Sequence, residues 1–303
     1  MNQQSHMAPI ALFTYNRPRH TRKTVEALQK NELAEKSDLF VYADGPRRME
    51  HADMVREVRE YIGTINGFKS VSIIERDENY GLARSIITGV TEIVNRFGKI
   101  IVLEDDMVTS PYFLHYMNQA LELYANDENV ICIHGYSYPV HTKLPETFFL
   151  KGADCWGWAT WKRGWDLFEA DGAKLLKELK SRNLEQRFDF FGTYDYTRML
   201  KEQIAGKNDS WAVRWYASAL LNDRLTLYPG QSLVHNIGTD NSGIHCGETN
   251  DYRTDIASKP AHLERLRPEE DKIALKIFQD YFNSIRTPFY MRLMRKLKVV
   301  AGC

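Results

Sequence analysis

The sequence lacks the features that define several large classes of protein. No apolar run reaches the ~18 residues that a membrane-spanning helix needs. The four cysteines are scattered, with no Cys-x-x-Cys pair, at Cys132, Cys155, Cys246 and Cys303. This scatter excludes a disulfide scaffold and the usual zinc sites. Because the N-terminus also has neither the basic nor the apolar segment of a signal peptide, we expect a cytoplasmic protein.

The chain also lacks a net charge, since 40 Lys and Arg residues balance 40 Asp and Glu residues. This balance argues against a general nucleic-acid-binding protein, which needs a basic surface. One asymmetry remains, because the segment from Arg286 to the C-terminus has five basic residues, no acidic ones and several bulky apolar ones. The pattern predicts either a helix that lies on an anionic membrane surface, at the inner face of the cell membrane, or an ordinary terminal helix that packs on the domain.

Short apolar runs alternate with amphipathic segments along the first hundred residues. Strand-like runs cover residues 9–13, 39–43, 71–74 and 99–103, and helical spacing follows each of the first three. Thr21 is the predicted N-cap of the first helix. The alternation predicts an α/β fold with a mostly parallel sheet and helices on both faces, followed by a more irregular second half.

Polar clusters follow three of these strands: Asn16-Arg17, Asp44-Gly45 and Glu104-Asp105-Asp106. In a parallel sheet the carboxyl ends of the strands meet at one edge, and ligands bind beyond that edge. We therefore expect the three clusters to converge on one ligand site.

The run Glu104-Asp105-Asp106 is the strongest chemical signal in the sequence. Three adjacent carboxylates repel one another, so their position after a buried strand favours a bound cation. Oxygen ligands of this kind suit Mn²⁺ or Mg²⁺. A solvated turn is the alternative. A nucleoside-triphosphatase strand is excluded because no Gly-x-x-x-x-Gly-Lys-Ser/Thr loop is present, and a Gly-x-Gly-x-x-Gly dinucleotide loop is also absent.

Several segments resemble those of a known enzyme family. The stretch from Ile101 to Phe113 resembles the metal motif of nucleotide-sugar glycosyltransferases, most closely the Glu-Asp-Asp form of the N-acetylglucosaminyltransferase I family and its bacterial relatives. The segment from Phe13 to Pro18 is similar to the first strand and loop of glycosyltransferase family two, and residues 79–84 resemble that family's Asn-x-Gly-x-x-x-Arg segment. The resemblance implies an A-type glycosyltransferase fold that is Rossmann-like on the nucleotide side.

The resemblance also implies roles for individual residues. Asp106 would hold the metal ion, and His235 would be a further ligand, although a lone histidine after a strand is often structural. Asp44 would hydrogen-bond the base of the donor, and Arg84 would lie near its pyrophosphate. Ordinary loop polarity is the alternative for Thr14, Arg17 and Arg84. The other implied donor-binding residues are Thr14, Asn16, Arg17, Glu104 and Asp105.

Tryptophan is concentrated in one short segment. Four of the six tryptophans lie between Trp156 and Trp165. Aromatic rings stack on the apolar faces of sugars, and a similar segment lies at the sugar subsites of the resembled family. We predict that Trp156, Trp158 and, further along the chain, Trp211 contact a sugar or the acceptor. The alternative is that these rings pack in a core.

Asp209 is the predicted catalytic base. It precedes Trp211 in a segment that resembles the family's acidic segment before a tryptophan. An inverting transfer needs one carboxylate to take the proton of the acceptor hydroxyl. The alternative is that Asp209 merely caps the following helix.

Together these features predict a metal-dependent, inverting glycosyltransferase that uses a nucleotide-sugar donor, preferably a UDP-sugar, and a glycan or lipid-linked acceptor in bacterial surface polysaccharide synthesis. The predicted catalytic domain covers residues 8–260, with a nucleotide-binding half at 8–110 and an acceptor half at 111–260. Residues 261–303 form the predicted helical, basic tail. The polar loop Thr239–Thr254 is typical of a lid. The alternatives are a non-catalytic carbohydrate- or nucleotide-binding module and a sugar-phosphate nucleotidyltransferase.

Overall fold

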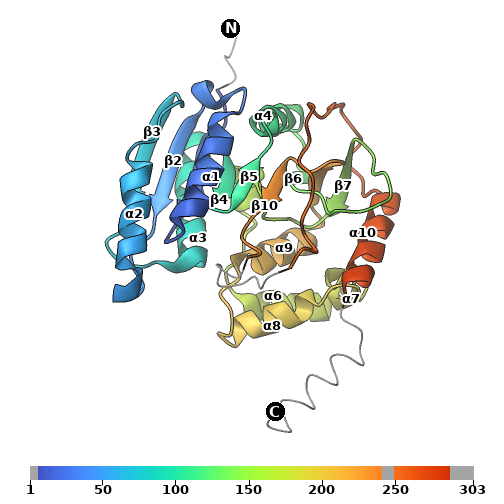
Figure 1. Cartoon of the computed structure of the whole chain (residues 1–303). Coiled ribbons are helices and arrows are strands. Elements are labelled where there is room, and N and C mark those ends of the chain that lie inside the picture. Colours follow the sequence, from blue (N-terminus) through green and yellow to red (C-terminus); the bar gives the residue numbers. More distant parts are fainter. Residues whose placement is uncertain (1–5, 241–248, 287–303) are drawn as a thin grey trace.

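One large sheet organises the chain (Figure 1). The computed structural model describes residues 6–240 and 249–286. The sheet has eight strands in the order β3-β2-β1-β4-β8-β6-β9-β7. A separate ribbon pairs β5 (Met107–Thr109) with β10 (Val234–Asn236) in antiparallel fashion. The predicted α/β class, with helices on both faces of a mostly parallel sheet, is confirmed.

The half of the sheet built from the first 104 residues is parallel throughout. Its strands are β1 (Ile10–Thr14), β2 (Asp38–Ala43), β3 (Ser70–Glu75) and β4 (Lys99–Glu104). The sequence predicted each of these strands to within two residues at either end. This accuracy follows from their composition, because strands covered on both faces are continuous apolar runs.

The second half of the sheet mixes directions. Here β8 runs antiparallel to β4 and β6, β9 runs parallel to β6, and β7 is antiparallel to β9. These strands are β6 (Val130–His134), β7 (Thr147–Lys151), β8 (Trp158–Trp161) and β9 (Leu225–Pro229). Because β8 pairs directly with β4, the two predicted halves of the catalytic domain share one continuous sheet. The predicted boundary at residue 110 therefore falls between strands of one sheet, and the predicted boundary at residue 260 lies after the last strand of that sheet.

Two apolar layers cover the two faces of the sheet. On one face Ile10 and Leu12 of β1 pack with α1 (Pro18–Gln29), α2 (Ala52–Ile62) and α4 (Phe113–Leu123). On the other face Ala11 and Phe13 pack with α3 and α9. This alternation is the period of two expected of a strand. The bounds of these two helices are Gly81–Phe97 and Trp211–Leu221.

A third apolar cluster lies under the helices of the second half. It includes Phe278 and Phe282 of α10 (Lys272–Ile285), which pack on β7 and β9 side chains. The other helices are α5 (Lys162–Trp165), α6 (Gly172–Ser181), α7 (Glu185–Phe188) and α8 (Tyr196–Ile204), with short 3₁₀ turns at Ala34–Lys36 and Met49–His51. No helix within the described ranges is both long and apolar enough to cross a bilayer. The basic tail beyond residue 286 lies outside the described residues, as do residues 241–248 of the predicted lid loop, with His245, Cys246 and Glu248.

The start of α1 corrects one prediction. The helix begins at Pro18, with Arg17 at the N-cap, rather than at Thr21. Proline is well suited to the first helical position, because its fixed φ matches the helix and the N–H that it lacks would have no helical partner there. Thr21 lies inside the helix, where its hydroxyl donates to the Arg17 carbonyl at 3.0 Å. The earlier start places the Arg17 side chain beside the end of β4.

Candidate active site

A cavity of about 1220 Å³ opens at the carboxyl ends of the parallel strands. All three predicted polar clusters line it, through Asn16 and Arg17 after β1, Asp44 after β2, and the acidic triplet at the end of β4. The predicted convergence at one edge of the sheet is thus confirmed. The opposite wall comes from the second half of the chain, including α8 and α9.

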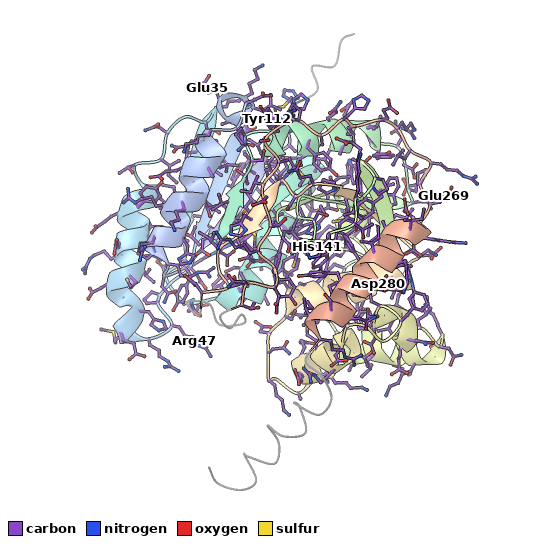
Figure 2. The ribbon with its side chains drawn as sticks, turned by 45° about the vertical axis from the view of Figure 1, so that its right-hand side comes forward. Glu35, Arg47, Tyr112, His141, Glu269 and Asp280 are labelled. Atoms are coloured by element: carbon purple, nitrogen blue, oxygen red, sulfur yellow. The ribbon has the colours of Figure 1, made fainter. Side chains whose placement is uncertain are left out.

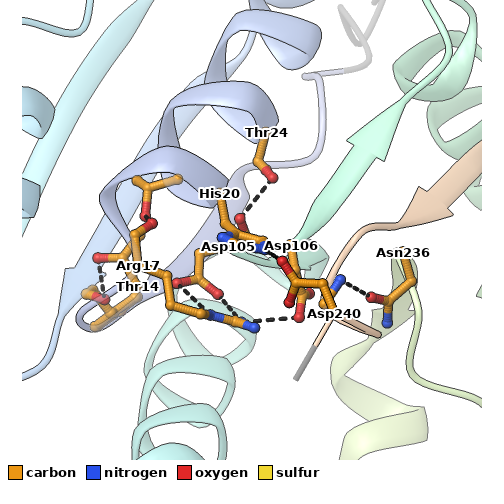
Figure 3. Close-up of polar contacts among 11 residues, drawn as sticks. Thr14, Arg17, His20, Thr24, Asp105, Asp106, Asn236 and Asp240 are labelled. Carbon is orange, nitrogen blue, oxygen red and sulfur yellow. Dashed lines mark hydrogen bonds and ion pairs between the residues drawn. The ribbon is translucent and has the colours of Figure 1, made fainter. Parts of the chain in front are cut away.

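Two members of the acidic triplet, Asp105 and Asp106, are paired with Arg17 (Figure 3). The Arg17 guanidinium forms an ion pair with Asp105, and its Nη2 donates to Asp106 Oδ2 at 2.9 Å. Burial alone would lower the pKa of Arg17, but these two carboxylates raise it above its ordinary value. Burial and repulsion from Asp106 raise the pKa of Glu104 to about 8. Arg17 therefore already neutralises part of the negative charge that the sequence assigned to a metal ion.

The end of β10 closes tightly over this group. The Ile237 N–H donates to the Asp106 carbonyl at 2.9 Å, and the Gly238 N–H donates to Asn236 Oδ1 at 2.7 Å. A Cβ atom at Gly238 would lie 2.1 Å from Asp106 Oδ2, so only glycine fits against the carboxylate. A strand far along the sequence thus helps to orient Asp106.

The carboxylates of Asp105 and Asp106 are the kind of oxygen ligand that a divalent cation such as Mg²⁺ or Mn²⁺ prefers. Asp106 Oδ1 is buried and has no hydrogen-bond partner, so one hard oxygen atom is unpaired. Within residues 6–240 and 249–286 no group of three or more His, Cys, Asp and Glu side chains is arranged as a metal site. An ion at Asp105 and Asp106 would therefore complete its coordination with donor or water oxygens, as Mg²⁺ commonly does.

His235 does not line the cavity with the carboxylates, and its role as a metal ligand stays a prediction. It lies in β10, where Asn236 lines the cavity and His235 does not. Successive side chains in a strand point to opposite faces, so both cannot face the same site. Burial and nearby Arg253 lower the pKa of His235, and its Nδ1 is buried without a partner.

Asp44 lies in the cavity wall, but its carboxylate already binds the chain itself. Oδ1 accepts the N–H groups of Gly45 and Tyr80, and Oδ2 accepts Gly81 N–H and the Asn79 side-chain amide, all at 2.7–3.0 Å. These four bonds use the full acceptor capacity of a carboxylate. Asp44 therefore caps the start of α3 and shapes the loop, and contact with a base stays a prediction.

Arg84 lies away from the cavity. Its guanidinium covers the Tyr80 ring at 3.6 Å from the ring centre and pairs with Glu78 at 3.3 Å. Position 84 faces outward in the first turn of α3, whereas Leu82 and Ser85 of the same turn line the cavity. Contact between Arg84 and a pyrophosphate stays a prediction.

The tryptophans divide between core and cavity. Trp158 is 0% exposed and stacks on Trp211 with ring centres 5.4 Å apart, and it also packs against Trp165 and Trp215. It does not line the cavity, which corrects its predicted sugar contact. Trp156 does line the cavity. Trp211 is 2% exposed and lines the cavity wall.

Asp209 lines the cavity with 65% of its side chain exposed. The cap of α9 is Ser210, whose Oγ accepts the Val213 N–H at 3.2 Å. The alternative in which Asp209 is only a helix cap is therefore excluded. The nearest cation is Arg214, whose Nη2 lies 3.5 Å from Asp209 Oδ1. The role of catalytic base stays a prediction.

Thr14 and Asn16 line the cavity, and the buried Thr14 hydroxyl donates to the Tyr42 carbonyl at 3.4 Å. Their donor-binding role stays a prediction. Sequence reasoning missed Arg47, which follows β2 and lies beside α2 (Figure 2). Its position just beyond a strand end was the available signal. It also missed Asp154, because the apolar run of β7 that precedes Asp154 was not recognised as a strand.

Comparison with known proteins gives a family. The GNT-I family model matches residues 1–165, and no curated protein matches the chain. Among solved structures, the Pyrobaculum calidifontis mannosyltransferase PcManGT, in complex with GDP-Man and Mn²⁺, is 14% identical, with a TM-score of 0.33 over 44% of this chain and 36% of that one. A UDP-glucose pyrophosphorylase complexed with UDP-glucose is 11% identical, with a TM-score of 0.36 over 74% of this chain and 90% of that one.

These two structural similarities are too low to carry an argument about activity. The chain spans little more than a third of the mannosyltransferase. The family match is of a different kind, because it covers more than half of the chain and runs from β1 through the acidic triplet to the tryptophan-rich segment. The chain therefore belongs to the GNT-I family of nucleotide-sugar glycosyltransferases.

Proposed function

We propose that this protein transfers a hexosyl or N-acetylhexosaminyl group from a nucleotide-sugar donor, preferably a UDP-sugar, to a hydroxyl of a glycan or glycolipid, with inversion. The observation that carries the proposal is the acidic triplet at the end of β4, held against Arg17 in a large cavity. Family membership supports the same chemistry. The proposed setting, bacterial surface polysaccharide synthesis at the inner face of the cell membrane, rests on the sequence resemblance.

Donor binding is assigned to the ends of β1 and β2. Arg17 and Arg47 both line this part of the cavity, and guanidinium groups bind phosphate oxygens in bidentate fashion. Their charge would stabilise the nucleoside diphosphate as it leaves. Asp105 and Asp106 would hold Mn²⁺ or Mg²⁺, which supplies further neutralisation of the same leaving group when bound. Asp105 and Asp106 also fix the orientation of Arg17.

Proton removal is assigned to Asp209. In a single displacement the acceptor oxygen attacks the anomeric carbon while its proton passes to a carboxylate. Asp209 lines the same cavity on the segment before α9, and 65% of its side chain is exposed. Inversion needs base and leaving group on opposite sides of the anomeric carbon, and Asp209 and Arg17 come from different halves of the chain.

A donor assay tests the proposal. We expect UDP release from a UDP-sugar to require Mn²⁺ and to be lost in Asp106→Asn. Asp166→Asn is the matched control, because Asp166 is an exposed carboxylate of the same kind paired with Lys162. Binding without release from any donor would instead indicate a non-catalytic module. Pyrophosphate release from UTP and a sugar phosphate would indicate a nucleotidyltransferase.

A further inference from the structure

Asp154 lies in the cavity on the segment between β7 and β8, where no role has been assigned to it. Its side chain is 21% exposed. Oδ1 accepts the Cys155 N–H at 2.8 Å, and Oδ2 accepts the Tyr228 hydroxyl at 3.2 Å. A carboxylate can accept about four hydrogen bonds. Asp154 therefore keeps the capacity to accept hydrogen bonds from a ligand in the cavity.

A buried histidine holds this segment in place. His134 is 0% exposed, and its Nε2 accepts the Trp156 N–H at 3.1 Å while lying 3.7 Å from Asp154 Oδ1. The same imidazole nitrogen thus contacts both the carboxylate and the backbone of the cavity-lining tryptophan. Groups fixed in this way need little reordering when a ligand binds. The arrangement has the character of a preformed site.

Asp154 and the acidic triplet line the same cavity. The last pair between β4 and β8 joins Val102 to Trp158 in antiparallel register. Glu104 lies two residues beyond Val102, and Trp156 lies two residues before Trp158. Before Trp158 the segment turns toward β6 and β9, where His134 accepts the Trp156 N–H and Tyr228 donates to Asp154. A donor bound at the triplet and an acceptor bound at Asp154 would therefore share one cavity.

The surroundings of Asp154 are aromatic. Trp156, Tyr138 and Tyr252 all line the cavity, and the Trp156 and Tyr252 rings meet edge to face with centres 5.5 Å apart. Aromatic rings pack on the C–H faces of pyranoses, and a carboxylate accepts bonds from sugar hydroxyls. The same carboxylate would repel a phosphate group. The combination matches a neutral sugar better than an anionic headgroup.

We propose that Asp154, Trp156 and Tyr252 form a binding subsite for a neutral pyranose unit of the acceptor, in which Asp154 selects the acceptor by accepting hydrogen bonds from its hydroxyls. The inference deepens the proposed function and rests on it, because the bound sugar is an acceptor only if the protein is a glycosyltransferase. The proposed acceptor is therefore a glycoside. The sugar unit that carries, or neighbours, the attacking hydroxyl would bind on this wall.

The test measures binding of a panel of methyl pyranosides (gluco, galacto, manno and N-acetylgluco) to the full chain by saturation-transfer-difference NMR, with UDP and Mn²⁺ present. We expect at least one glycoside to bind the parent. Asp154→Asn should weaken that binding on the order of tenfold or more, because it removes a charged acceptor. Asp166→Asn should bind the glycoside as the parent does.

A second variant guards against loss of folding in Asp154→Asn. Tyr252→Leu removes a ring of the subsite without touching the bonds of Asp154, and should weaken the same glycoside. If Asp154→Asn does not fold, Tyr252→Leu decides the question. The proposal is overturned if no glycoside binds the parent, or if the folded variants bind it as tightly as the parent. UDP binding, measured in the same samples, reports separately on the proposed donor site.

Discussion

The two walls of the cavity are built on different principles. On the nucleotide side, polar residues at the ends of parallel strands are held by backbone N–H groups and by an ion pair, as with Asp44 and Arg17. On the side that we propose for the acceptor, Tyr138, Trp156 and Tyr252 come from segments far apart in the sequence and contact one another through their rings. The first wall depends on local chain geometry, whereas the second depends on how distant segments pack.

The largest expected effect comes from breaking the acidic end of β4. Asp106→Ala should reduce turnover by at least 10²–10³-fold, because it removes both a partner of Arg17 and a ligand for the proposed cation. Steady-state assays across a range of Mn²⁺ concentrations would measure this loss. Turnover with unchanged Mn²⁺ dependence would show that the cation binds elsewhere.

Asp209→Asn tests whether the acceptor wall carries the base. We expect kcat to fall by roughly 10²–10⁴-fold, because an amide cannot take the proton of the acceptor hydroxyl. The KM for the donor should change little, since the proposed phosphate contacts lie on the opposite wall. A loss below about tenfold would mean that another carboxylate of this wall is the base.

Asp44→Ala tests whether the nucleotide wall depends on backbone capping. The change leaves the N–H groups of Tyr80 and Gly81 without their acceptor, and we expect a loss of about 1–3 kcal/mol in the free energy of unfolding. Urea denaturation would measure it. Binding of UDP should weaken as well. Weakened binding with unchanged stability would favour a direct contact with the base over the capping role.

We expect His134 to make the proposed acceptor wall sensitive to acid. Burial lowers the pKa of His134 below its ordinary 6.5, although Asp154 partly opposes the shift. The unfolded chain then binds more protons than the folded one, so stability should fall as the pH drops below about 6.5. The loss is about 1.4 kcal/mol for each unit of pKa depression.

Denaturation curves between about pH 5 and pH 8 would show this trend. Because every group whose pKa changes on folding contributes to the pH dependence of stability, a variant is needed to assign the trend to one histidine. His134→Gln should flatten the curve, whereas His262→Gln, at an exposed position, should not. Equal acid sensitivity in the parent and His134→Gln would place the effect on another residue.

Prediction from sequence succeeded where the pattern was local. Strands β1 to β4 are apolar runs, and the polar residues that follow them converge because parallel strands end at one edge. Prediction failed where a residue reaches the cavity only if its side chain points in one particular direction. Arg84 turns outward on α3, and His235 and Asn236 face opposite sides of β10, a choice that residue identity does not encode.

By itself the sequence determined the α/β class, the edge of the sheet where the cavity lies, and the acidic triplet within it, because each follows from hydrophobic periodicity and chain direction. Only the tertiary structure decided that Arg17 neutralises the triplet, that Trp158 belongs to the core, and that Asp154 faces the cavity. These outcomes depend on contacts between residues more than 20 positions apart, which packing sets and local sequence does not.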